Sequence, residues 1–111
     1  MSDSHISHLQ VVPLPDGGGL RVIGAVDLST REAWRKVLES ATASGAPTRL
    51  DLSELSFIDT RGASMLLSAA QRQPDTAPLT ITRPPRVLRR VLAVLCPGEP
   101  AQIVIEEQEA S

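Results

Sequence analysis

The chain has 111 residues, which is enough for one domain with a single modest hydrophobic core. Its formal net charge of −2 gives no general attraction to nucleic acid or to a membrane surface, and its one cysteine, Cys96, excludes an internal disulfide framework. No apolar run is long enough to span a membrane, and the N-terminus lacks the layout of a signal peptide. We therefore expect a cytoplasmic protein with one domain over residues 1–111 and loose tails at 1–8 and 106–111.

The first half of the chain predicts a β-hairpin followed by a helix. Residues 9–12 and 20–26 have the composition of strands, and the segment rich in Pro and Gly between them has that of a turn. Ser29 and Glu32 have the three-residue spacing of a capping box, which places a helix near 30–44. The apolar face of that helix is expected to consist of Trp34, Val37, Leu38 and Ala41.

The second half of the chain alternates strands and helices. Strands are expected at 48–52, 79–82 and 101–105. Helices are expected near 61–73 and 85–96, because Pro or Gly residues end both apolar patterns. The inward faces of these two helices are Ala63, Leu66, Leu67 and Ala70 in the first, and Val87, Leu88, Val91, Leu92 and Leu95 in the second.

This order of elements predicts an α/β fold: a mixed five-stranded sheet that starts with a hairpin and is backed by three main helices. Binding loops in such sheets gather at the carboxyl ends of the strands. Two polar segments follow strands in this way, Asp27 to Thr30 and Ser53 to Gly62. The second of them ends at a helix start, where unpaired N–H groups and the positive end of the helix dipole can hold a phosphate.

The segment from Leu50 to Gly62 resembles the signature of the STAS domain, the fold of bacterial anti-sigma-factor antagonists. That signature is an apolar strand, Asp-Leu-Ser, a short spacer, and Phe-x-Asp-Ser-Ser/Thr-Gly. A second match is Gly24-Ala25-Val26-Asp27 followed by Thr30, where the family typically has Gly-Glu, an apolar residue, Asp and a nearby Thr. The resemblance covers nearly the whole chain, from Leu9 to Ile105.

The resemblance implies a function in bacterial signalling and transcription regulation through protein–protein interaction. Members of the family bind an anti-sigma factor, usually a kinase of the GHKL ATPase type, and thereby release a sigma factor. The kinase inactivates the antagonist by phosphorylating the Ser or Thr just before the motif glycine, and a phosphatase restores it. No cofactor, nucleic acid or membrane is implied, and a homodimer stays an open alternative. Because the chain shows no catalytic constellation, we do not expect an enzyme.

At its most important position the chain departs from the family. Asp59 and Gly62 fall on the family's Asp and Gly, but Arg61 falls on the phosphorylated hydroxyl. Arginine offers no hydroxyl and stays cationic. Thr60 lies one residue earlier, roughly 100° away around a helix, and Ala25 stands where the family has Glu. We therefore expect no regulation by phosphorylation at the usual position, with Thr60 as the one candidate for a displaced acceptor.

The candidate partner-binding residues are Asp27, Thr30, Asp59, Thr60, Arg61 and Gly62. Several of them also have a purely structural interpretation. Asp59 or Thr60 could serve only as the N-cap of the helix. Asp27 could be a turn residue that accepts hydrogen bonds from the following backbone N–H groups. Arg61 could be a solvated surface residue, whose ion pairs are worth about 1 kcal/mol or less.

Other polar residues give weaker signals. An arginine cluster near the third helix could bind an anion or nucleic acid, but it fits the solvated face of an amphipathic helix better, without an aromatic residue for base stacking. This cluster consists of Arg83, Arg86, Arg89 and Arg90. His5 and His8 lack a third ligand for a metal, and Cys96 is expected to be a buried, unreactive thiol.

Three functions stay open at the level of the sequence. The leading one is an anti-sigma-factor-antagonist-like protein that binds its partner without phosphorylation at the usual site. The second is a scaffold subunit of a larger sensory complex. The third is a STAS module that binds a small ligand.

Overall fold

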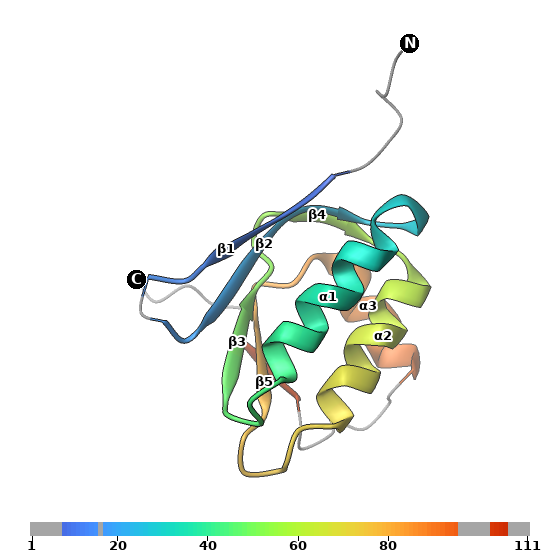
Figure 1. The fold of residues 1–111 in the computed structure, drawn as a ribbon. Coiled ribbons are helices and arrows are strands. Elements are labelled where there is room, and N and C mark those ends of the chain that lie inside the picture. The colour runs from blue at the N-terminus through green and yellow to red at the C-terminus, as the bar shows by residue number, and fades with distance from the viewer. Residues whose placement is uncertain (1–7, 16, 96–102, 107–111) are drawn as a thin grey trace.

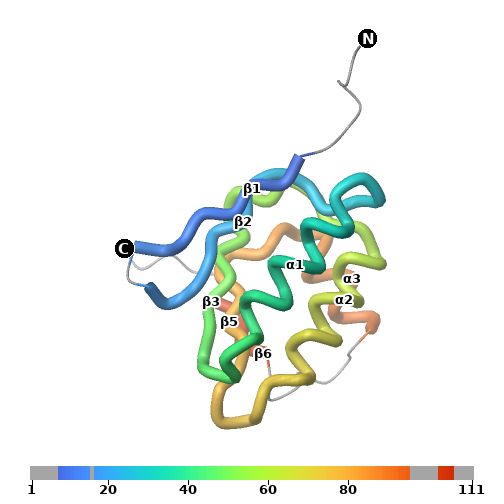
Figure 2. The backbone as a smooth tube through the Cα atoms, viewed as in Figure 1, coloured from blue at the N-terminus to red at the C-terminus, as the bar shows by residue number. Residues whose placement is uncertain are grey.

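The computed structural model describes residues 8–15, 17–95 and 103–106, and Figures 1 and 2 show how these segments fold. In chain order the elements are β1 (Leu9–Pro13), β2 (Gly19–Val26), the 3₁₀ helix η1 (Leu28–Thr30), α1 (Arg31–Thr42), β3 (Thr48–Asp51), β4 (Leu55–Ile58), α2 (Thr60–Gln71), β5 (Leu79–Thr82), α3 (Arg86–Leu95) and β6 (Ile103–Glu106). Within these residues, none of the helices combines the length and the apolar character that a membrane span requires.

The six strands of the described residues form one mixed sheet, whose main path is β1-β2-β3-β5-β6. β1 pairs antiparallel with β2, which confirms the hairpin, and the other strand pairs are parallel. Helices connect β2 to β3, β4 to β5 and β5 to β6, and all three helices lie on the same side of the sheet (Figure 1). The predicted α/β fold, with a mixed sheet and three main helices, is confirmed.

The core lies between the sheet and the helices and is built mostly from aliphatic side chains. The whole predicted face of α1 is buried. In α2, Leu67 is only partly buried and Ala69 takes a buried place, because the inner face of the helix is wider than the predicted stripe. In α3, Leu88 and Leu92 are buried, whereas Leu95, at the end of the helix, is 39% exposed.

The sheet has one strand more than the sequence predicts, because β4 forms inside the segment expected to be a loop at 53–62. β4 pairs with the last three residues of β2, and the register of this pairing shifts by one residue between Gly24 and Ala25. Gly24 permits this shift, since its φ is +121° and a Cβ there would lie 2.1 Å from the carbonyl oxygen of His8. Burial does not alternate along β4, where the two outer residues are buried and the two inner ones exposed, so the sequence shows no strand period and the pairing with β2 identifies the strand.

The predicted loose tails at 1–8 and 106–111 each include one residue that is held by the sheet. Glu106 belongs to β6, which pairs with β5, and the carbonyl oxygen of His8 accepts a hydrogen bond from the N–H of Ala25. Both residues are therefore held by backbone pairing. The predictions that lie outside the described residues are those for the rest of the tails (1–7 and 107–111), His5, Cys96, the helix stop at Pro97-Gly98 and the first residues of the last strand, 101 and 102.

Asp51, at the end of β3, points to the side of the sheet away from the helices and is nevertheless buried. Its carboxylate accepts hydrogen bonds from Arg21 Nε at 3.1 Å and from the N–H of Ser53 at 3.0 Å. Burial alone would raise the pKa of Asp51, but the hydrogen bonds from Ser53 and Arg21 outweigh it and hold the pKa below its ordinary value. Asp51 thereby fixes the turn that leads from β3 into β4.

The depressed pKa of Asp51 predicts a loss of stability in acid. Because the pKa is lower in the folded chain than the value of about 3.9 in the unfolded chain, the ionised carboxylate stabilises the fold above about pH 4. That contribution is lost as the pH falls through the folded-state pKa. We expect Asp51→Asn to lower the free energy of unfolding by about 1–2 kcal/mol at pH 7 and to flatten its decline below about pH 4.

Denaturation curves across this pH range, followed by circular dichroism, measure the effect. The control is Glu54→Gln, which neutralises an exposed carboxylate in the same turn. An equal flattening in both variants would show that the acid sensitivity does not come from Asp51.

Candidate functional site

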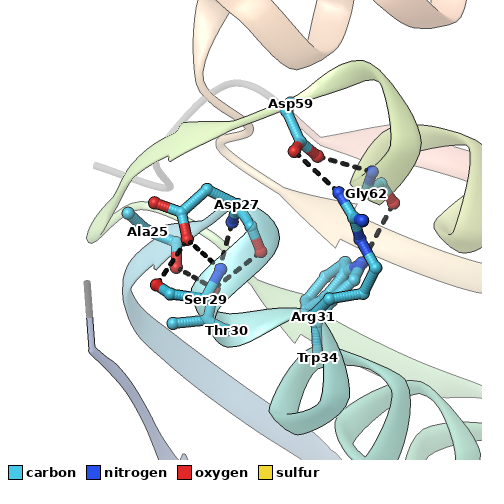
Figure 3. Close-up of polar contacts among 8 residues, drawn as sticks. All are labelled: Ala25, Asp27, Ser29, Thr30, Arg31, Trp34, Asp59 and Gly62. Carbon is cyan, nitrogen blue, oxygen red and sulfur yellow. Dashed lines mark hydrogen bonds and ion pairs between the residues drawn. The ribbon is translucent and has the colours of Figure 1, made fainter. Parts of the chain in front are cut away.

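The two candidate loops lie side by side at the carboxyl ends of β2 and β4 (Figure 3). Val26 and Ile58, the last residues of these strands, are paired, and the N–H of Asp59 donates to the carbonyl oxygen of Val26 at 3.0 Å. The loops that start at Asp27 and Asp59 therefore leave the sheet next to each other. We call the region formed by residues 27–31 and 59–62 the motif surface.

The first loop is held by a capping box formed by Asp27 and Thr30. The carboxylate of Asp27 accepts hydrogen bonds from the N–H and the hydroxyl of Ser29, at 2.9 and 2.7 Å. The hydroxyl of Thr30 accepts from the N–H of Asp27 at 3.0 Å and donates to the carbonyl oxygen of Ala25 at 2.7 Å. Figure 3 shows these bonds folding the loop back onto the end of β2.

The predicted capping box of Ser29 and Glu32 is wrong. The 3₁₀ helix over Leu28–Thr30 follows β2 directly, so the extended residue that caps it is Asp27. Glu32 instead forms an exposed ion pair with Arg35 in the first turns of α1. Both residue pairs have the same three-residue spacing, and the spacing alone does not distinguish them.

Thr30 has only 5% of its surface exposed, and its hydroxyl is used within the loop. A partner cannot reach that hydroxyl, so Thr30 can affect binding only by holding the loop in its conformation. Asp27 is partly exposed, and its carboxylate caps the turn as the structural interpretation expects. These two residues shape the loop from which Leu28 and Ser29 are exposed.

The second loop starts α2, and Asp59 is its N-cap rather than Thr60. Asp59 Oδ1 accepts a hydrogen bond from the N–H of Gly62 at 2.8 Å. A carboxylate in this place satisfies an unpaired N–H group and interacts favourably with the positive end of the helix dipole. The hydroxyl of Thr60 therefore does not cap the helix.

Gly62 is buried where α2 meets the ends of β2 and β4. A Cβ at this position would lie 2.6 Å from Val26 Cγ1 and 2.9 Å from Ile58 Cγ1, distances that side chains do not adopt. The carbonyl oxygen of Gly62 also accepts a hydrogen bond from Trp34 Nε1 at 3.0 Å, in a buried position. Glycine is needed at this position because the packing leaves no room for a Cβ.

Arg31 joins the two loops, although it is not among the residues predicted from the sequence. Its Nη2 donates to Asp59 Oδ2 at 3.0 Å, and each of the two side chains is 29% exposed (Figure 3). Arg31 Nε is buried without a hydrogen-bond partner among the described residues, so the ion pair with Asp59 is the main compensation for this guanidinium. No sequence signal could have identified the pair, because its members are 28 residues apart and Arg31 occupies no motif position.

Thr60 and Arg61 are the exposed members of the second loop. Neither side chain forms a hydrogen bond or an ion pair with any residue that the structure describes. On the first loop, Leu28 is 77% exposed. The motif surface therefore presents a cation, hydroxyl groups and an apolar side chain, and hydrogen bonds beneath them hold the two loops in place. Protein interfaces commonly combine these kinds of groups.

The remaining candidates lie elsewhere in the fold. Arg86, Arg89 and Arg90 are exposed on α3, in agreement with the solvated face of an amphipathic helix, and Arg83 is partly buried just before it. Across the described residues, no cluster of His, Cys, Asp and Glu has the size that a metal ion requires.

The elements described above form a small α/β domain with a mixed sheet. A family model described as "Mlab, STAS domain" matches residues 11–96, and the chain therefore belongs to the STAS domain family. A solved structure with the same fold is that of an anti-sigma factor antagonist from Mycobacterium paratuberculosis, with a TM-score of 0.63 and 18% sequence identity over 80% of this chain and 77% of that one. The comparison with curated proteins gives no match.

The substitution Gly62→Ala tests whether close packing holds the start of α2. We expect the free energy of unfolding to fall by about 1–3 kcal/mol, because the new methyl group would overlap Val26 and Ile58 by more than the gain in helix propensity can offset. Chemical denaturation measures this change. Thr60→Ala is the control in the same turn, with an expected change within about 0.5 kcal/mol. If Gly62→Ala is as stable as the control, α2 can move away from the sheet at no cost.

Proposed function

We propose that this chain is a regulatory protein similar to anti-sigma-factor antagonists, which binds a protein partner through the motif surface and is not switched by phosphorylation at the usual position. Membership of the STAS family supports the class of protein. The antagonist with the same fold supports the kind of partner, an anti-sigma factor or a GHKL-type kinase. In this proposal the protein acts in the bacterial cytoplasm, without a cofactor.

The observation that carries the proposal is the exposed Arg61 in the first turn of α2. A phosphorylated Ser or Thr at this position would carry nearly two negative charges. Arginine carries a fixed positive charge instead. The charge of the binding surface therefore stays constant, and binding is controlled by the amounts of the two proteins rather than by modification.

The packing of α2 supports the view that Thr60 does not replace the missing acceptor. Gly62 fits against Val26 and Ile58, and Asp59 caps the same turn, so the rotation of the helix about its axis is set. Thr60 precedes Arg61 by one residue and therefore points roughly 100° away from it. A kinase aligned for the usual position would meet the side chain of Arg61.

Phosphorylation of the purified chain by a cognate GHKL-type kinase with ATP tests this part of the proposal. We expect no stoichiometric phosphoprotein from the wild type, as measured by intact-protein mass spectrometry. Arg61→Ser restores a hydroxyl and should permit phosphorylation, in combination with Ala25→Glu if the kinase also needs the family's acidic residue. Stoichiometric phosphorylation of the wild type at Thr60, abolished by Thr60→Ala and accompanied by loss of partner binding, would contradict the proposal.

Binding to the partner tests the role of Arg61 itself. The partner is identified by crosslinking and mass spectrometry of the tagged chain in the cells that produce it, and its affinity is then measured with both purified proteins. We expect Arg61→Ala to raise the Kd about tenfold, or ~1.4 kcal/mol, while the melting temperature stays close to that of the wild type. The control is Arg72→Ala, which removes an exposed arginine after the other end of α2. An equal effect of both changes would indicate general charge attraction rather than contact at the motif surface.

One structural feature favours the small-ligand alternative. A groove of about 280 Å³ lies between α1 and α2, and its lining includes Arg35 and Glu39 from α1 and Ser64 and Ser68 from α2. Leu38 and Met65 also line this groove, so it offers a small ligand both apolar contacts and polar groups. Native mass spectrometry of the purified chain would reveal a retained ligand. The scaffold alternative differs in stoichiometry, because a scaffold subunit copurifies with a complete complex in fixed proportion.

A further inference from the structure

β1 forms one end of the sheet, and no residue that the structure describes pairs with its outer edge. Four of its five residues are exposed, and they include Val11 and Val12 with exposed fractions of 41% and 43%. The strand contains no charged residue. An exposed edge strand without charges is a template for pairing with another strand, which proteins usually block with Lys, Pro or a bulge.

The hydrogen bonds at the two ends of β1 show which of its backbone groups face outward. His8 and Leu14 both bond to the β2 side of the hairpin, through a carbonyl oxygen and an N–H respectively. Hydrogen-bonded positions alternate along an antiparallel ladder, so the backbone groups of Leu9, Val11 and Pro13 point to the outer edge. Pro13 therefore removes no hydrogen bond from the β1–β2 ladder, and Leu9 and Val11 keep free N–H groups at the edge.

The opposite end of the sheet differs in charge. β6 ends with Glu106, which forms an ion pair with Arg49 of β3. Acidic residues at an edge oppose the pairing of two identical strands, because like charges meet. β1 therefore offers a second copy of the chain an edge without charges, whereas the edge formed by β6 carries Glu106.

We propose that two copies of this chain pair through β1, antiparallel and around a two-fold axis at Val11. In this register the two Val11 residues exchange both N–H···O=C bonds, and the N–H of Leu9 in each copy donates to the carbonyl oxygen of Pro13 in the other. The Val11 side chains meet on the axis, where no charge opposes them. The carbonyl oxygen of Leu9 gains no bond in this register, because Pro13 has no N–H. The bonds of Val11 and the N–H of Leu9 hold the pair, and the two six-stranded sheets become continuous. The inference is independent of the proposed function, because β1 and the motif surface share no residue.

Sedimentation velocity at increasing protein concentration tests the dimer, with a monomer mass of 11.9 kDa. Because an edge of five residues is small for an interface, we expect a Kd between about 10 µM and about 1 mM. Val11→Lys places two like charges on the axis and should raise the Kd at least about tenfold. The matched control is Val94→Lys, at a position of α3 that is 78% exposed, and it should leave the Kd unchanged.

Amide hydrogen exchange of the wild-type chain locates the contact without relying on the folding of any variant. The N–H groups of Leu9 and Val11 should become protected as the concentration passes the Kd, whereas those of Gln10 and Val12 should be protected throughout. Val11→Pro removes only an outward N–H and should also weaken the dimer, with an unchanged circular dichroism spectrum. A chain that stays monomeric up to about 1 mM, or a dimer that forms without protection of Leu9 and Val11, would overturn the proposal.

Discussion

The close approach of the start of α2 to the ends of β2 and β4 is the constraint on which the motif surface depends. Gly62 lets the helix backbone lie against Val26 and Ile58, and this contact sets both the position and the rotation of the helix. Two hydrogen bonds hold the same turn: the N–H of Gly62 donates to the carboxylate of Asp59, and the indole N–H of Trp34 donates to the carbonyl oxygen of Gly62. With a larger residue at this position, the first turn of α2 would have to move away from Val26 and Ile58.

The STAS motif in this chain separates into a structural part and a chemical part. Asp59 and Gly62 hold the helix start. Arg61 is exposed and forms no ion pair among the described residues, so the fold places no demand on it. A change of the residue at position 61 can therefore alter the chemistry of the surface while the structure beneath it stays the same.

Much of the fold could be predicted from the sequence, because the apolar residues of the helices recur every three or four positions. In α1 the residues at this spacing, from Trp34 to Ala41, are all buried. The strand β4 could not, because burial does not alternate along Leu55–Ile58 and its pairing with β2 contains a register shift. For the site, the motif residues could be placed near one another, since both loops follow strands. The ion pair of Arg31 with Asp59 could not, because a contact between side chains 28 residues apart leaves no local pattern.

The hydrogen bond from Trp34 to Gly62 also gives the molecule an optical property. Trp34 is the only tryptophan in the chain, and the chain contains no tyrosine, so its near-ultraviolet fluorescence comes almost entirely from one indole ring. That ring is buried and bonded to the turn of α2 in which Thr60 and Arg61 are exposed. A change in the environment of this turn therefore reaches the emission spectrum directly, and the unlabelled protein contains its own fluorescent reporter beneath the motif surface.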